Sequence, residues 1–175
     1  MNTGILHARR RLLLSAGAGL LLAVRPHARA ATAPRGIEIA MAGTPTGSAV
    51  WFRPRGLRLK AGQTVHWVNR DTGNVHTATA YHPDNGKPLR IPRGATPWNS
   101  DYLLPGESFA VTFEIPGVYD YFCLPHEHAG MVGRIVVEGP AVPQAPYADT
   151  DDRLPAAALA HLPQVADILR DGAID

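Results

Sequence analysis

The chain has 175 residues, of which 45% are hydrophobic and 18% are charged, and its formal net charge is +2 at pH 7. This length suits a single domain. The absence of a basic run and of aromatic residues interleaved with cations excludes a nucleic-acid-binding protein. A single cysteine, Cys123, excludes a disulfide within the chain and leaves three interpretations: a free buried thiol, an intermolecular bridge or a metal thiolate.

Residues 1–30 have the layout of an export signal. Arginines at 9–11 precede an apolar run over 12–24, and Ala28-Arg29-Ala30 forms an A-x-A cleavage site before Ala31. The run is shorter than the roughly 17–25 residues of a membrane-spanning helix, and the paired arginines resemble a twin-arginine signal, with an ordinary secretory signal as the alternative. We therefore expect a periplasmic protein with no membrane span after cleavage. After cleavage, residues 31–175 would contain 12 Lys and Arg and 15 Asp and Glu, which gives a net charge of −3.

The segment from 36 to 138 predicts an all-β domain. Short stretches of alternating or β-branched residues, separated by Gly, Pro and Asn turn signals, predict eight strands. These stretches are 36–42, 48–52, 56–60, 64–69, 74–81, 107–115, 118–123 and 133–138. Many short strands without helix-period segments favour a β-sandwich or a barrel. A loop with four prolines, over 81–100, interrupts them, and a loop of this length is usually functional or covers part of its domain.

The composition changes after Gly139, which places a domain over 31–139 and a tail over 140–175. The tail begins as a Pro- and Ala-rich linker and then predicts two short helices. Their limits are set by Asp152 as a cap, Pro155 near the start, Pro163 as a break and Gly172 at the end. The apolar residues that could form one stripe are Leu159, Leu162, Val165, Ile168 and Leu169. Packing of this stripe on its own domain is favoured; docking of a partner is the alternative.

The metal-ligand side chains gather behind the single cysteine. Cys123, His126 and Met131 follow the pattern C-x-x-H-x-x-x-x-M, and a thiolate, imidazoles and a weak thioether are the ligands of a blue-copper site. Cys123 ends one expected strand and Met131 precedes the next, so these side chains can converge. His76, near the start of a strand in the same domain, is the natural fourth ligand.

Other ligands and metals fit the pattern less well. His128 lies too close to Met131 to replace His126, and the remaining histidines of the domain and tail are expected at the surface or in packing positions. These histidines are His66, His82 and His161. Zinc is possible by ligand type, but closed structural zinc sites prefer more cysteines and tetrahedral geometry.

Two long stretches resemble plastocyanin-type cupredoxins. "GLRLKAGQTVHWVNRDTGNVHTATA" is similar to the first-histidine region of that family, and "LLPGESFAVTFEIPGVYDYFCLPHEHAGMVGRIVVEG" is similar to its copper loop. The resemblance implies a Greek-key β-sandwich of about eight strands. It also implies one type 1 copper ion, whose ligands are His76, Cys123, His126 and, axially, Met131.

The sequence departs from plant plastocyanins around the site. Val75 stands where a proline is usual, Thr77 where an asparagine is usual, and Phe122 where plants have a tyrosine that serves as a remote electron port. The acidic clusters of the plant proteins have no clear counterpart. The copper site therefore carries over, whereas a photosynthetic partner does not, and a pseudoazurin-, amicyanin- or halocyanin-like role fits as well.

The resemblance implies a monomeric carrier of single electrons, Cu(II)/Cu(I), with transient redox partners such as a cytochrome or an oxidoreductase, and the export signal places this carrier in the periplasm. An enzyme is not expected: a single cysteine cannot build a dinuclear copper centre, and Phe122 and Leu124 flank Cys123 where multicopper oxidases place histidines. A copper-binding module for storage, delivery or sensing is the alternative. Such modules are often rich in Met or His, and after residue 30 this chain has only Met41 and Met131.

Overall fold

The computed structural model describes residues 36–140, 147 and 153–175, all within one compact unit. Within these residues the chain forms nine strands, two 3₁₀-helices and two α-helices. In chain order they are β1 (Ile37–Gly43), β2 (Val50–Arg53), β3 (Gly56–Leu59), β4 (Gln63–Asn69), β5 (Thr79–Ala80), η1 (Pro83–Asn85), β6 (Ser108–Phe113), β7 (Gly117–Phe122), η2 (Leu124–Ala129), β8 (Val132–Val137), α1 (Ala156–His161), α2 (Val165–Asp171) and β9 (Ala173–Ile174). The predicted all-β class is confirmed, and the export signal predicted over 1–30 lies outside the described residues.

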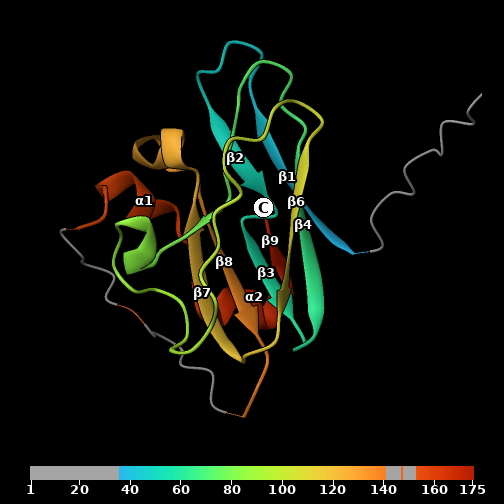
Figure 1. Ribbon diagram of the computed structural model, residues 1–175, viewed down its shortest axis with the longest axis vertical. Coiled ribbons are helices and arrows are strands. Elements are labelled where there is room, and N and C mark those ends of the chain that lie inside the picture. The colour runs from blue at the N-terminus through green and yellow to red at the C-terminus, as the bar shows by residue number, and fades with distance from the viewer. Residues whose placement is uncertain (1–35, 141–146, 148–152) are drawn as a thin grey trace, which may run out of the picture. The chain divides into compact units, whose positions relative to one another are not determined.

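The strands form two sheets that face each other as a sandwich (Figure 1). Sheet A has the order β2-β1-β4-β6, and sheet B has the order β5-β7-β8-β3-β9. The β1–β4 and β3–β8 pairs are parallel, and the other pairs are antiparallel. Both parallel pairs join strands that are not consecutive in the chain, so the sandwich closes through contacts between distant segments.

An aromatic core fills the space between the sheets. Trp67 of sheet A lies edge-on to Tyr121 of sheet B, with ring centroids 5.3 Å apart, and Trp98 from the long loop lies edge-on to Phe113 at 5.5 Å. All four side chains are buried. Aromatic side chains bury about 150–250 Å² each, and edge-to-face pairs add to that stabilisation. The alternation that predicted the strands therefore does point one set of side chains into a shared core.

Seven of the eight predicted strands are confirmed, with ends within two residues of the prediction. The eighth, over 74–81, is wrong in extent, because only Thr79–Ala80 pairs as a strand. Upstream of it, His76 makes an isolated bridge with Leu103, and Ala78 N–H bonds to the Ser100 hydroxyl, which replaces a backbone partner. The β-branched residues of 74–81 correctly indicated an extended backbone. The segment beside 74–78, which contains Ser100 and Leu103, is an irregular loop and does not continue the hydrogen-bond pattern of a sheet.

The predicted helices are confirmed as α1 and α2, which end before Pro163 and Gly172. The predicted cap Asp152 lies outside the described residues. Beyond α2, Gly172 has a positive φ of 82° and the chain turns into β9, a strand that the sequence did not predict and that pairs with β3. The tail therefore contributes an edge strand to sheet B as well as helices.

Packing of the tail on its own domain is confirmed, but its apolar residues form two groups where one stripe was predicted. Around α1, the buried residues are Leu154, Ala158 and Leu162, which cluster with Tyr81, Phe122 and Val132. Around α2, they are Val165 and Ile168, which cluster with Val118 and Val136. Pro163 separates the helices, so each one covers a different part of the outer face of sheet B. Strands β7 and β8 are consequently buried on both faces.

A buried ion cluster joins the tail, the sheet and the long loop. The carboxylate of Asp120 accepts hydrogen bonds from Arg90 Nε at 2.9 Å and Arg134 Nε at 2.6 Å, and Arg134 also donates to the carbonyl of Pro163 at 2.8 Å. The three charged residues are at most 4% exposed. Buried charges are tolerated when they are paired and fully hydrogen-bonded, so this cluster fixes where the loop and the tail can lie on sheet B.

Candidate metal centre

Three of the predicted ligands converge at one end of the β7–β8 hairpin. Cys123 follows β7, His126 lies in η2, and His76 comes from the irregular connection between β4 and β5. Cys123 Sγ is 3.6 Å from His76 Nδ1 and 3.4 Å from His126 Nδ1, and one ligand atom from each residue lies within 4.8 Å of the others. Metal–sulfur and metal–nitrogen bonds are about 2.0–2.3 Å long, so ligand atoms at these separations can share one ion.

Backbone hydrogen bonds bend the loop between the cysteine and the methionine. His126 N–H donates to the Cys123 carbonyl at 3.0 Å, Met131 N–H to the His126 carbonyl at 3.1 Å, and Cys123 N–H to the Met131 carbonyl at 3.0 Å. Gly130 allows the reversal because its φ is 82°, in the left-handed region that favours glycine. Met131 is fully buried in the same core cluster as Cys123. The spacing of Cys123, His126 and Met131 in the sequence thus corresponds to one turn of the backbone, which these hydrogen bonds close.

Thr77 supports the thiol from the other side of the site. Its backbone N–H donates to Cys123 Sγ at 3.3 Å, and its hydroxyl accepts a hydrogen bond from Leu124 N–H at 2.8 Å. Burial raises the pKa of the Cys123 thiol to about 11, although hydrogen bonds from the backbone of Thr77 and His126 and from the Thr77 side chain oppose the shift. A buried thiol of this kind becomes a thiolate when a cation binds to it, which suits a metal ligand and not a free nucleophile.

His76 is held by a carboxylate that the sequence analysis did not single out. His76 Nε2 is 3.1 Å from Asp71 Oδ2, and both side chains are almost fully buried. Burial lowers the pKa of His76, although Asp71 opposes this effect. Burial also acts to raise the pKa of Asp71, but hydrogen bonds from Gly73, Asn74 and His76 outweigh it and lower that pKa. The neutral imidazole and ionised carboxylate suit a metal ligand, because bound histidines usually donate their second N–H to such an acceptor.

The loop that carries His126 is also held at Glu127, through partners that the sequence did not predict. This buried side chain accepts a hydrogen bond from the hydroxyl of Tyr81 at 3.0 Å and pairs with the ammonium of Lys87. On another side of the loop, the His161 ring from α1 packs so closely on Gly130 that a Cβ there would lie 2.5 Å from His161 Nδ1. Both contacts join segments far apart in the sequence, so local patterns could not reveal them.

His126 is the ligand that lies nearest to solvent. His76 and Cys123 are fully buried, whereas His126 is partly exposed. His128 is exposed and lies outside the cluster of His76, Cys123 and His126, which favours His126 over His128 as the ligand. Four exposed apolar residues lie next to this cluster in the sequence or in the fold. Val75 precedes His76 and Leu124 follows Cys123, while Tyr102 and Leu104 flank Leu103, the bridge partner of His76. We call these four residues the apolar rim.

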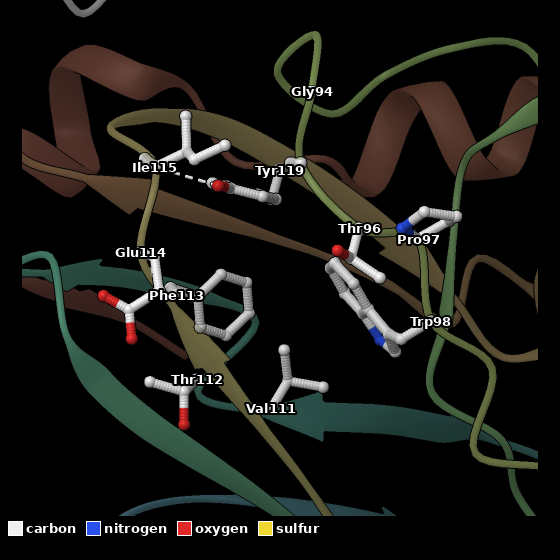
Figure 2. Close-up of a pocket in the computed structure, with 11 residues that line it drawn as sticks. Gly94, Thr96, Pro97, Trp98, Val111, Thr112, Phe113, Glu114, Ile115 and Tyr119 are labelled. Carbon is white, nitrogen blue, oxygen red and sulfur yellow. Dashed lines mark hydrogen bonds between the residues drawn. The ribbon is translucent and has the colours of Figure 1, made fainter.

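A cavity of about 340 Å³ lies elsewhere, between the long loop and β6 (Figure 2). Trp98, Phe113, Ile115 and Tyr119 surround it, and the Tyr119 hydroxyl donates to the Ile115 carbonyl at 2.6 Å. None of the four predicted ligands lines this cavity, so the metal centre is a compact cluster of side chains and not a ligand-sized pocket.

Comparisons with known proteins agree with this site. Residues 39–138 match the family model described as copper binding proteins, plastocyanin/azurin family. The chain is 40% identical over 100 residues to plastocyanin of Scenedesmus fuscus, covering 55% of this chain and 94% of that protein. It is 36% identical over 125 residues to plastocyanin of Prochlorothrix hollandica, covering 69% and 84%.

A solved structure extends the likeness to the fold. A pseudoazurin from Sinorhizobium meliloti matches with a TM-score of 0.54 and 27% identity, covering 77% of this chain and 98% of that one. The donor set and its spacing fit one type 1 copper ion with the ligands His76, Cys123, His126 and Met131. The chain therefore belongs to the plastocyanin/azurin family of copper-binding proteins.

Proposed function

We propose that this protein is a monomeric periplasmic electron carrier that passes single electrons between transient redox protein partners. The observation that carries this proposal is the asymmetry of the ligand set. One ligand, His126, reaches toward the surface beside the apolar rim, while His76, Cys123 and Met131 are fully buried. Electrons can pass through the exposed imidazole edge without a partner displacing any ligand.

Copper bound at this site supplies the Cu(II)/Cu(I) couple, and the chain keeps the ligands in place. The Thr77 N–H stabilises charge on Cys123 Sγ, and Asp71 orients His76. Glu127 ties the loop of His126 to Tyr81 and Lys87. Ligands held in this way move little when the charge of the ion changes, which suits rapid electron exchange.

The apolar rim supports docking of a redox protein. Tyr102 and Leu104 are each 55% exposed, and Val75 and Leu124 adjoin the ligands His76 and Cys123. Redox encounters use small interfaces, commonly below about 1,200 Å², so a modest apolar surface around one ligand is sufficient. The expected partner is a cytochrome or an oxidoreductase with an apolar margin around its own redox centre.

The periplasmic location is supported by the export-signal layout of residues 1–30. Among the residues that the structure describes, no helix is long and apolar enough to cross a membrane. Fractionation of cells that express the full chain tests the location: we expect the protein in the periplasm, and replacement of both Arg9 and Arg10 by Lys should retain it in the cytoplasm if the signal is of the twin-arginine type.

Copper reconstitution of the purified protein tests the carrier function. We expect an intense visible absorption from the Cys123 thiolate with Cu(II), and reversible one-electron voltammetry. Cys123→Ser should lose the colour yet remain folded, because the residue ends its strand and the alternating core positions are untouched. A colourless Cu(I) protein that readily gives up its metal to a chelator would instead support copper storage or delivery. An equally coloured Cys123→Ser variant would overturn the ligand assignment.

A further inference from the structure

We infer that Asp71 is a positioning residue that lowers the reduction potential of the copper site by acting through His76. This inference rests on the proposed electron-carrier function. Asp71 Oδ2 is 3.1 Å from His76 Nε2, and His76 Nδ1 faces Cys123 Sγ at 3.6 Å. Both carboxylate oxygens of Asp71 already accept hydrogen bonds, Oδ1 from Gly73 N–H and Oδ2 from Asn74 Nδ2, so the imidazole is the donor in this contact and its proton resides on Nε2. Nδ1 is then left with a free electron pair directed at the metal position.

The carboxylate is held in place by its own turn. Asp71 Oδ1 accepts a hydrogen bond from Gly73 N–H at 2.9 Å, and Oδ2 accepts one from Asn74 Nδ2 at 2.8 Å. Asn69 Oδ1 accepts from the backbone N–H of Asp71 at 2.9 Å. The Asn69 amide group also donates to the carbonyls of Asn74 and Leu103, both at 2.9 Å. Asn69 is 1% exposed and Asp71 5% exposed, so the turn is a buried, hydrogen-bonded cradle.

A glycine on another strand makes room for the same carboxylate. At Gly43, the last residue of β1, an added Cβ would lie 2.2 Å from Asp71 Oδ2 and 3.2 Å from the Ala49 carbonyl oxygen. A contact of 2.2 Å is far inside van der Waals distance, and Asp71 Oδ2 is the oxygen that bonds to His76. A side chain at position 43 would therefore displace the group that orients the ligand, which is independent structural evidence that this position is built around the carboxylate.

In the part of the chain that the structure describes, no lysine or arginine pairs with Asp71. Its side-chain hydrogen bonds come from Gly73, Asn74 and His76, and a histidine that binds a metal ion is neutral. Glu127, on the other side of the site, is paired with Lys87. An unbalanced negative charge in a low-dielectric interior interacts strongly with nearby charge, and it stabilises Cu(II) more than Cu(I). The preference of the site for Cu(II) over Cu(I) thus depends on Asp71, a residue that does not itself bind the metal.

The test compares Asp71→Asn with the unchanged protein as full-chain copper proteins. Asparagine keeps an oxygen acceptor for His76 Nε2–H and removes the charge. We expect the ratio of Cu(II) affinity to Cu(I) affinity to fall at least tenfold, which corresponds to a rise in reduction potential of about 59 mV or more. Glu38→Gln is the matched control, because it removes one carboxylate charge that is exposed and paired with Arg70. Its screened charge should change the ratio less than twofold.

Metal-free protein provides a second measurement. Nitrogen NMR of the unchanged chain should show the His76 proton on Nε2, and Gly43→Ala should raise the fraction of the Nδ1–H tautomer by displacing the carboxylate. A proton on Nδ1 in the unchanged chain overturns the inference even if Asp71→Asn fails to fold. The inference is also overturned if the reduction potential of Asp71→Asn equals that of the Glu38→Gln control or lies below it. If the unchanged protein shows no reversible Cu(II)/Cu(I) couple, the proposed function itself fails.

Discussion

The two histidine ligands belong to regions of the molecule that are built in different ways. His76 lies in the connection between β4 and β5, where it is fully buried and bonded to the carboxylate of Asp71. His126 lies in η2, partly exposed, in a loop that is held through its neighbour Glu127. The first region fixes a ligand directly, and the second fixes the backbone and leaves the ligand at the surface. A carrier needs both, because the metal must be retained while its electron remains reachable.

Rescue by free imidazole is the sharpest way to test this difference. In copper-loaded His126→Gly, added imidazole should enter from solvent and restore most of the visible absorption, because the lost side chain reached the surface. In His76→Gly, imidazole should restore little, because the space lies in the core beside Asp71. Absorption titrations of the two variants provide the measurement. Equal rescue of both would show that the two sides of the site are equally accessible.

Loss of each histidine should also affect the stability of the metal-free protein differently. His76→Ala leaves a buried cavity and removes a hydrogen bond to a charged group, which we expect to lower the free energy of unfolding by about 2–4 kcal/mol. His126→Ala removes a partly exposed ring and should cost less than about 1 kcal/mol. Urea unfolding of both variants measures the difference. Similar losses would mean that Asp71 does not depend on His76 for its place in the core.

The tether at Glu127 should make a smaller contribution. Glu127→Gln keeps an acceptor for the Tyr81 hydroxyl but removes the ion pair with Lys87, whose side chain is 25% exposed. We expect a loss of about 1–2 kcal/mol, because solvent near Lys87 compensates part of the lost pair. Tyr81→Phe is the companion variant and removes only the hydroxyl. Urea unfolding that shows no change for Glu127→Gln would mean that the loop of His126 is held by its own backbone turn and by α1.

The smallest effect is expected at His128, which is exposed and outside the ligand cluster. His128→Ala should leave the copper spectrum unchanged and alter the free energy of unfolding by no more than about 0.5 kcal/mol. Absorption and urea unfolding check both statements. A changed spectrum would move the solvent-facing ligand from His126 to His128 and would remove the basis of the comparison.

Local patterns in the sequence predict the strands and the ligands well. In β6, the alternation of Phe109, Val111 and Phe113 indicates which side of the strand faces the core, and all three contribute to it. The copper loop is equally local, because the spacing of Cys123, His126 and Met131 corresponds to one hydrogen-bonded turn. Only His76, the fourth predicted ligand, had to be chosen from another part of the chain.

What the sequence did not reveal depends on contacts between distant segments. Asp71 stands in "NRDTGN", where an aspartate before a glycine indicates a turn, and its role as the partner of His76 appears only after folding. The space left by Gly43 and the bond between Tyr81 and Glu127 are of the same kind. The short β9 strand has too few residues to show a period, and it forms because Gly172 turns the chain toward β3.

The topology of sheet B also determines how the site can assemble in time. Three ligands arrive together on the β7–η2–β8 hairpin, whereas β3 must find β8 across most of the domain, with Gly56 opposite Arg134. Local hairpins close in microseconds, while sandwiches dominated by distant pairings fold in milliseconds to seconds. In refolding experiments, the cysteine, the surface histidine and the methionine are therefore expected to come together well before the buried histidine joins them.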